Sequence, residues 1–253
     1  MLIYHCVSCL NYELRHQWEV SSVVESYGDH MPDIILDVAT LKGADNPLRY
    51  PQAEAAKRNY RVKLRYYPTD KETFAYRGMV RNEQIARAIE AKADWVYFSD
   101  CDRAYHPTYF SELCRHLKKL RRCNKLVAVR KRLCTDLDHT AQLIKDSHAD
   151  GFHHVNAYYR ASMLPLAWTR WYLLATGGMQ VVRLARLKEL GGYYANPNKR
   201  KRDQNMFTDG QRAHSDVYFR KRVGGSHMVT LPPSLHLEHS RDKEAGKHLE
   251  EQR

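Results

Sequence analysis

The sequence has no apolar run near the roughly 20 residues that a membrane-spanning helix needs. It also has no basic segment followed by a long apolar stretch at its amino end, where residues 1–10 already have the pattern of a strand. Internal repeats and low-complexity tracts are absent as well. We therefore expect a cytoplasmic protein without a signal peptide or membrane span, which leaves room for peripheral membrane contact at most.

Cysteine is too sparse for a disulfide framework, because six cysteines are spread over 253 residues. Cys6 and Cys9 form a C-x-x-C pair, but there is no second pair at similar spacing to complete a zinc site. In a strand, positions three apart face opposite sides of the sheet. We therefore expect two buried thiols in a reducing compartment.

Acidic residues are outnumbered, since 41 Lys and Arg against 29 Asp and Glu give a formal net charge of +12. Such a surface attracts anions, including nucleic acid, acidic lipid and nucleotide diphosphates. The cations lie in short groups, among them residues 199–202 and 220–222, without a basic tail or a regularly basic helix. A nucleic-acid-binding protein would need a concentrated basic face or a recognisable motif, so we keep this class only as an alternative.

The sequence does contain apolar strand-like runs that alternate with helical patterns. Strand candidates occupy residues 3–9, 33–38, 61–66, 95–98 and 126–129, and helix candidates occupy residues 18–26, 79–93 and the segment that Pro107 opens. Strands separated by helices of this length predict a mainly parallel sheet covered on both faces. The predicted fold class is therefore α/β and Rossmann-like, with a mixed, mainly parallel sheet flanked by helices on both faces.

Two acids, Asp100 and Asp102, follow the apolar strand candidate at residues 95–98. In an open parallel sheet, ligands bind beyond the carboxyl ends of the strands. Residues two apart can both reach one hard cation, and Mg²⁺ or Mn²⁺ would bridge them to a diphosphate. A surface turn is the alternative, because Asp is common in turns. A second D-x-D, Asp136 to Asp138, follows a less regular apolar run, and we interpret it as a loop.

The surroundings of the first acid pair resemble the donor-binding half of glycosyltransferase family 2, which has the GT-A fold. That family shows an Arg-Asn pair that opens a helix, then an apolar strand, a D-x-D and a Pro-led helix. The same features occur here in the same order, as Arg81-Asn82, residues 95–98, Asp100 with Asp102, and Pro107. The resemblance continues in residues 176–182, a glycine loop with Gly177 and Gly178, and in residues 187–193, a helix that glycines terminate.

The resemblance implies one GT-A catalytic domain over residues 1–240, followed by a charged tail at 241–253. Residues 1–105 would bind a nucleotide sugar, with a UDP-sugar favoured and a GDP-sugar as the other option, and residues 106–240 would bind the acceptor. Mn²⁺ or Mg²⁺ would be held by Asp102 and Asp100, with His239 as a further ligand and His236 as its alternate. The residues expected to contact the donor are Asp37, Arg81, Asn82, Asp100, Gly177 and Gly178. For the two glycines, a plain turn is an equal alternative.

One segment departs from the family, which usually carries E-D-x-D/E-L-x-x-R near the catalytic base. Here Asp216 matches the last acid when counted back from Arg220, while the earlier acidic positions hold Ala213 and His214. The base is therefore Asp216 or His214, with Asp209 as a third candidate. A salt bridge between Asp216 and Arg220 on one helix face is the structural alternative.

The function implied is that of a hexosyltransferase-type glycosyltransferase in glycan or polysaccharide biosynthesis. It would move a sugar from a nucleotide-diphosphate sugar to an acceptor hydroxyl by direct, inverting displacement. The loop at residues 193–211 would close over the donor, or would simply be a solvated basic loop. A sugar-nucleotide nucleotidyltransferase is the alternative enzyme, but it would need a Gly-rich phosphate loop near the first strand, and residues 7–12 contain no glycine.

Overall fold

The computed structural model describes residues 1–9, 13–43, 59–149, 168–171, 179–193 and 214–237. Within these ranges, the larger sheet has seven strands in the order β10-β6-β9-β4-β1-β2-β3. The strands are β1 (Leu2–Cys9), β2 (Asp33–Leu41), β3 (Val62–Thr69), β4 (Trp95–Ser99), β6 (Leu126–Val129), β9 (Met179–Arg183) and β10 (Ser226–Val229). Only β9 runs antiparallel to its neighbours, β4 and β6, so the sheet is mixed and mainly parallel, as predicted.

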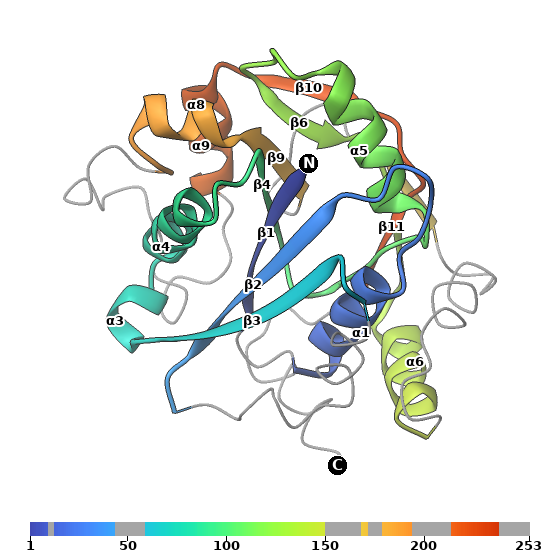
Figure 1. Cartoon of the computed structure of the whole chain (residues 1–253). Coiled ribbons are helices and arrows are strands. Elements are labelled where there is room, and N and C mark those ends of the chain that lie inside the picture. Colours follow the sequence, from blue (N-terminus) through green and yellow to red (C-terminus); the bar gives the residue numbers. More distant parts are fainter. Residues whose placement is uncertain (10–12, 44–58, 150–167, 172–178, 194–213, 238–253) are drawn as a thin grey trace.

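Helices cover both faces of this sheet (Figure 1). On one face lie α4 (Arg77–Glu90), α8 (Leu184–Leu190) and α9 (His214–Val223), and on the other lie α1 (Glu13–Val24) and α5 (Tyr109–Lys119). Each face has its own apolar cluster, because alternate residues of a strand point to opposite sides. Cys6 belongs to one cluster and Cys9 to the other, and both thiols are buried, as expected, and form no disulfide.

A second, smaller sheet was not predicted. Its four strands, in the order β5-β11-β7-β8, are β5 (Arg103–Ala104), β11 (Ser234–His236), β7 (Lys131–Cys134) and β8 (Trp168–Trp171). β11 pairs antiparallel with β5 and parallel with β7. This pairing brings the segment before residue 238 against the residues that immediately follow Asp102. The second sheet therefore shapes the surroundings of the acid pair.

Two sequence interpretations need correction. The segment 136–138, expected to be a loop, begins the helix α6 (Leu137–Ala149), and Asp136 Oδ1 accepts a hydrogen bond from the His139 amide at 2.8 Å. This is the contact of a helix N-cap, which explains an acid at that position. Residues 179–182, expected to belong to a glycine loop, lie in the buried strand β9, where pairing to β4 and β6 on both sides fixes them.

The helix ends follow local chemistry. Gly191 ends α8 with a φ of 69°, the left-handed conformation that glycine adopts most readily, as expected for this helix C-terminus. The short helix α3 (Lys71–Phe74) begins at Asp70, whose carboxylate accepts from the Thr73 amide. In the part of the chain that the structure describes, no helix has both the length and the apolar character needed to cross a membrane.

Asp37 lies in the middle of β2 and connects the sheet to α4. Its carboxylate accepts hydrogen bonds from Arg87 at 2.7 and 3.0 Å, from the Tyr4 hydroxyl at 2.6 Å and from the Gln84 amide at 3.1 Å. The residue has no exposed surface. We call these four residues the Asp37 cluster. They hold the Asp37 side chain between the sheet and α4, and a direct contact of Asp37 with a nucleotide stays a prediction.

Replacing Asp37 with alanine should lower the free energy of unfolding by about 3 kcal/mol or more, because buried donors on Tyr4 and Gln84 and the Arg87 charge lose their acceptor. Urea denaturation measures this loss. The exposed acid Asp29 provides the control, and Asp29→Ala should change stability by less than about 0.5 kcal/mol. Equal stability of the two variants would contradict the role of the cluster.

Candidate functional site

Asp100 and Asp102 lie at the carboxyl end of β4, as the sequence predicts. β4 lies between β1 and β9 in the sheet, and all five of its residues are buried. The side chain of Asp100 is 28% exposed, whereas that of Asp102 is only 7% exposed. Asp100 is therefore the acid that faces solvent, while Asp102 lies inside the protein.

Asp102 is held by the second sheet. Its carbonyl oxygen accepts from the Leu237 amide at 3.0 Å, and its Oδ1 lies 3.3 Å from His236 Nδ1 and 3.4 Å from Arg103 Nε. Burial lowers the pKa of His236, although the nearby Asp102 carboxylate opposes this effect, so the imidazole is neutral at neutral pH. His236, the alternate of the sequence prediction, is thus the histidine placed beside Asp102, while His239 lies outside the described residues.

Two guanidinium groups connect the acids. Arg77, the first residue of α4, lies 3.7 Å from Asp100 and 3.4 Å from Asp216, and Arg103 lies 3.5 Å from Asp100. The Arg77 side chain is 25% exposed, so a cation reaches solvent next to Asp100. Arg77 is not among the site residues predicted from the sequence. Its position four residues before Arg81, on the same helix face, is the signal that could have identified it.

Asp216 is buried in a cluster of donors. Its Oδ1 accepts from Arg81 at 2.8 Å and from the Tyr193 hydroxyl at 3.0 Å, and Arg77 approaches its Oδ2. Burial raises the pKa of this carboxyl, but Arg81, Arg77 and Tyr193 outweigh burial and hold it below its usual value. We call these four residues the Asp216 cluster. The ion pairs reach α4 rather than Arg220 on the same helix, and a buried carboxylate with a lowered pKa is a weak proton acceptor.

Arg81 and Asn82 also have contacts that the sequence did not predict. The Arg81 guanidinium donates to the Tyr193 hydroxyl and lies 5.0 Å from the ring centre of Phe98. Asn82 Oδ1 accepts from the Tyr193 amide at 2.7 Å. Arg81 is only 3% exposed. Both residues were expected at the donor, and here they fix Tyr193 against the sheet; a direct donor contact stays a prediction.

Ser99, the last residue of β4, joins a buried polar network beneath the acids. Its hydroxyl donates to Glu19 Oε1 at 2.9 Å and lies 2.7 Å from His5 Nε2, and His16 lies 3.1 Å from the other Glu19 oxygen. Burial lowers the pKa of His5 to about 3 and raises that of Glu19. All four residues are buried, so this Ser–His–Glu arrangement supports the end of β4 and is not accessible as a nucleophile.

The structure describes only some of the remaining predicted site residues. His214 is the first residue of α9, but its side chain is not among those described. The following predicted positions lie outside the described residues: Gly177, Gly178, Asp209, His239 and, apart from Tyr193, the loop at 193–211. Their proposed roles stay predictions.

The side chains around the end of β4 include carboxylates and an imidazole, which are ligand types of metal cations. Among the described residues, no group of three or more His, Cys, Asp or Glu side chains is arranged to hold a metal ion. Mg²⁺ is usually bound by one or two carboxylates together with waters and substrate phosphates rather than by an all-protein cage. The carboxylates of Asp100 and Asp102, with His236 beside Asp102, are ligand types that such a cation uses, and cation binding here stays a prediction.

Solved structures share this fold, although no family model and no curated protein sequence matches the chain. S. aureus TarS 1–349 in complex with UDP-GlcNAc is similar with a TM-score of 0.56 and 13% identity, covering 97% of this chain and 60% of that one. The mannosyltransferase PcManGT from Pyrobaculum calidifontis, in complex with GDP-Man and Mn²⁺, has a TM-score of 0.52 and 16% identity, with 99% and 61% covered. The chain therefore has the GT-A fold of glycosyltransferases and spans about 60% of the length of these two structures.

Replacing Asp216 with asparagine should lower the free energy of unfolding at pH 7 by about 3 to 5 kcal/mol, because Arg81 is left buried without its carboxylate. Since the pKa of Asp216 is lowered on folding, this stabilisation is present above the ordinary value of 3.8 and is lost as the pH falls below it. The difference in free energy of unfolding between the wild-type protein and the variant should therefore become smaller as the pH is lowered, and denaturation curves at decreasing pH measure it.

The control is Asp138→Asn, an exposed acid in the first turn of α6, which should leave stability unchanged at every pH. An Asp216→Asn variant with full stability but no enzymatic turnover would contradict the structural role and would favour Asp216 as the catalytic base.

Proposed function

We propose that the chain is a glycosyltransferase that moves a sugar from a nucleotide-diphosphate sugar to an acceptor hydroxyl. The observation that carries the proposal is the position of Asp100 and Asp102 at the carboxyl end of β4 in a GT-A fold, with Arg77 beside Asp100. Ligands of open α/β sheets bind at this end of the strands. TarS and PcManGT, which share the fold, were solved with UDP-GlcNAc and with GDP-Man and Mn²⁺, and this supports a nucleotide-sugar donor.

The donor half of the site is assigned to residues 1–105 and the acceptor half to residues 106–240. Arg77 is placed to bind the diphosphate, because its partly exposed guanidinium lies next to Asp100. A bound Mn²⁺ or Mg²⁺, with Asp102, Asp100 and either His236 or His239 as its ligands, would neutralise charge on the leaving diphosphate. Arg103 and the Leu237 amide hold Asp102 in its position.

Transfer also requires a base that accepts the proton of the acceptor hydroxyl. Asp216 and His214 are the two candidates. The lowered pKa of Asp216 and its buried contacts with Arg81 and Tyr193 favour His214, which begins the same helix two residues earlier. Attack in line with the leaving group would invert the configuration at the sugar.

Asp102→Asn and Asp100→Asn should each reduce sugar transfer by about 100-fold or more, because the cation that would neutralise the leaving diphosphate loses a charged ligand. The assay is release of nucleotide from UDP-GlcNAc and GDP-Man, each with and without Mn²⁺. The matched control is the other acid pair, Asp136→Asn with Asp138→Asn, in which asparagine can still cap α6. Full metal-dependent turnover by Asp102→Asn, with thermal melts confirming the fold of every variant, would contradict the site.

UDP with Mn²⁺, at a concentration 100 times its Kd, should stabilise the protein against heat by about 2.7 kcal/mol, and GDP with Mn²⁺ at the same concentration should stabilise it less. Arg77→Gln should weaken this binding by roughly tenfold, since one charged contact to phosphate is removed. Arg115→Gln serves as the control, because Arg115 pairs with Glu112 on the helix at the opposite face of the sheet. The assignment of Arg77 would be wrong if both variants bound UDP equally.

A further inference from the structure

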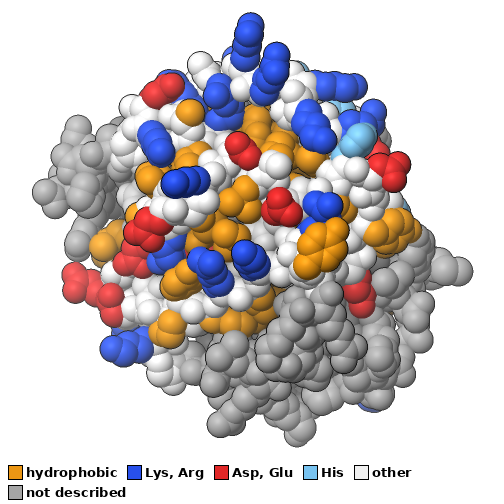
Figure 2. Space-filling view, in the orientation of Figure 1, with side chains coloured by type: hydrophobic (Ala, Val, Ile, Leu, Met, Phe, Trp, Pro, Cys, Tyr) orange, Lys and Arg blue, Asp and Glu red, His pale blue; other side chains and the backbone are white. Residues whose placement is uncertain are grey.

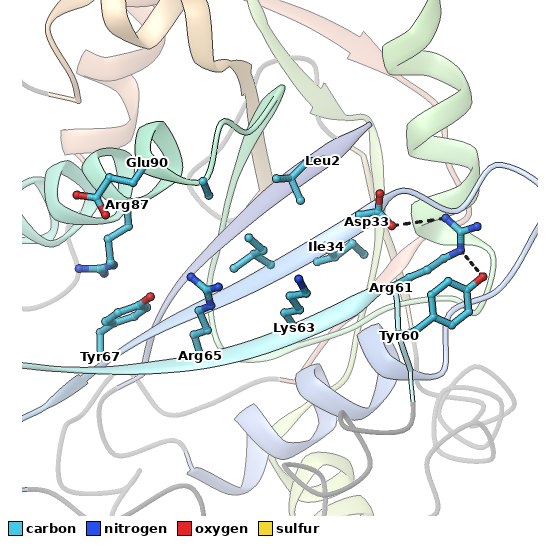
Figure 3. A pocket seen from close by; sticks show the side chains of 12 residues that line it. Leu2, Asp33, Ile34, Tyr60, Arg61, Lys63, Arg65, Tyr67, Arg87 and Glu90 are labelled. Carbon is cyan, nitrogen blue, oxygen red and sulfur yellow. Dashed lines mark hydrogen bonds and ion pairs between the residues drawn. The ribbon is translucent and has the colours of Figure 1, made fainter.

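A pocket lies toward the amino ends of β1 and β2, away from Asp100 and Asp102 (Figure 3). It is bounded by the first residues of β1 and β2, by β3, and by the last turn of α4, and it has a volume of about 630 Å³. Cavities of about 300 to 1,000 Å³ hold small-molecule ligands. Asp100 and Asp102 follow the carboxyl end of β4, whereas Leu2 and Asp33, the first residues of β1 and β2, line this pocket. The pocket is therefore separate from the proposed sugar-transfer site.

Two of its cations are already paired. Arg61 lies 3.6 Å from Asp33, and Arg87 binds Asp37 within the Asp37 cluster at 2.7 Å. These pairs neutralise charge and hold both guanidinium groups at the wall of the pocket. Arg61 and Arg87 thus shape the pocket more than they supply charge to a ligand.

Lys63 and Arg65 supply the positive charge. They occupy alternate positions of the edge strand β3, are exposed, and both point into the pocket (Figure 3). Within the described ranges neither side chain has an ion-pair partner. Their backbone positions are about 7 Å apart, as expected for residues two apart on a strand. The acids among the lining residues are Asp33, which pairs with Arg61, and Glu90 in the last turn of α4.

The rest of the lining is apolar and aromatic. Leu2, Ile34 and Ile35 form part of the wall. The ring of Tyr67 stacks under the Arg87 guanidinium at 3.9 Å, and Tyr60 at the other end is 82% exposed. Figure 2 shows basic side chains over hydrophobic surface on this side of the molecule, interspersed with acidic ones. A ligand in this pocket would contact the two cations Lys63 and Arg65 and also an apolar and aromatic surface against which an organic group can pack.

We propose that this pocket binds a phosphorylated small molecule. Lys63 and Arg65 hold the phosphate group, since arginine matches its oxygens with two donors and lysine adds a point charge. The organic part of the ligand packs against Leu2, Ile35 and the exposed ring of Tyr60. Two free cations in a cavity of this size suit one phosphate group, whereas a nucleic acid would need an extended basic surface. The proposal does not depend on the sugar-transfer function.

Phenyl phosphate is a suitable probe, titrated by calorimetry into the full chain, with inorganic phosphate and phenol for comparison. Phenyl phosphate should bind more tightly than inorganic phosphate, and phenol should not bind measurably. Lys63→Ser with Arg65→Ser should weaken binding of phenyl phosphate by roughly tenfold or more. Lys119→Ser with Arg122→Ser removes the same two residue types at the end of α5 and should leave binding unchanged.

Asp102→Asn should retain phenyl phosphate binding, and this result would separate the pocket from the sugar-transfer site even if the chain proved to have no transferase activity. The proposal is overturned if both double variants bind alike, if Asp102→Asn abolishes binding, or if inorganic phosphate binds as tightly as phenyl phosphate. It is also overturned if the chain binds vesicles of phosphatidylglycerol but no soluble phosphate, because the pocket would then serve a lipid surface.

Discussion

The buried contact between Arg81 and Asp216 is the interaction on which the candidate site depends. It connects α4 to α9 across 135 residues of sequence, and the same guanidinium lies over the rings of Phe98 in β4 and of Tyr193. A buried ion pair is tolerated only where further hydrogen bonds satisfy its charges, and Tyr193 supplies one. With α4 fixed in this way, its first residue, Arg77, reaches solvent beside Asp100.

Five of the seven strands of the larger sheet could be predicted. β1, β2, β4 and β6 are mostly buried and read as short apolar runs, of which residues 95–98 are the clearest, while β3 alternates with period two. β9 and β10 were not predicted. The smaller sheet could not be predicted either. Strand β7 reads KRLC and β11 is three residues long, so neither has a period that distinguishes it from a loop. Their pairing links Arg132 to Ser234, and such distant partners leave no local signal.

The location of Asp100 and Asp102 was predictable for a local reason, since acids that follow a buried strand lie at its end whatever the rest of the chain does. The contacts of Asp37 and Arg81 could not be predicted, because their partners Arg87 and Asp216 are 50 and 135 residues away along the chain. Spacing also failed to choose between His236 and His239. The pairing of His236 with Arg103 across β11 and β5 is what places it beside Asp102.

The positive charge of the chain attracts ligands only where internal ion pairs do not neutralise it. Arg81, Arg87 and Arg61 each have an acid within 3.6 Å, so their charges are largely neutralised. At physiological salt, diffuse attraction between exposed charges is screened beyond about 8 Å, and a net charge of +12 cannot select a ligand by itself. Selectivity must come from cations that stand at defined positions. Lys63 and Arg65 meet that condition, because β3 fixes their backbones and neither pairs with an acid among the described residues. Arg77 is held by α4 between Asp216 and Asp100, at 3.4 and 3.7 Å, so a ligand at the other end of the strands meets a cation whose charge is shared with two acids.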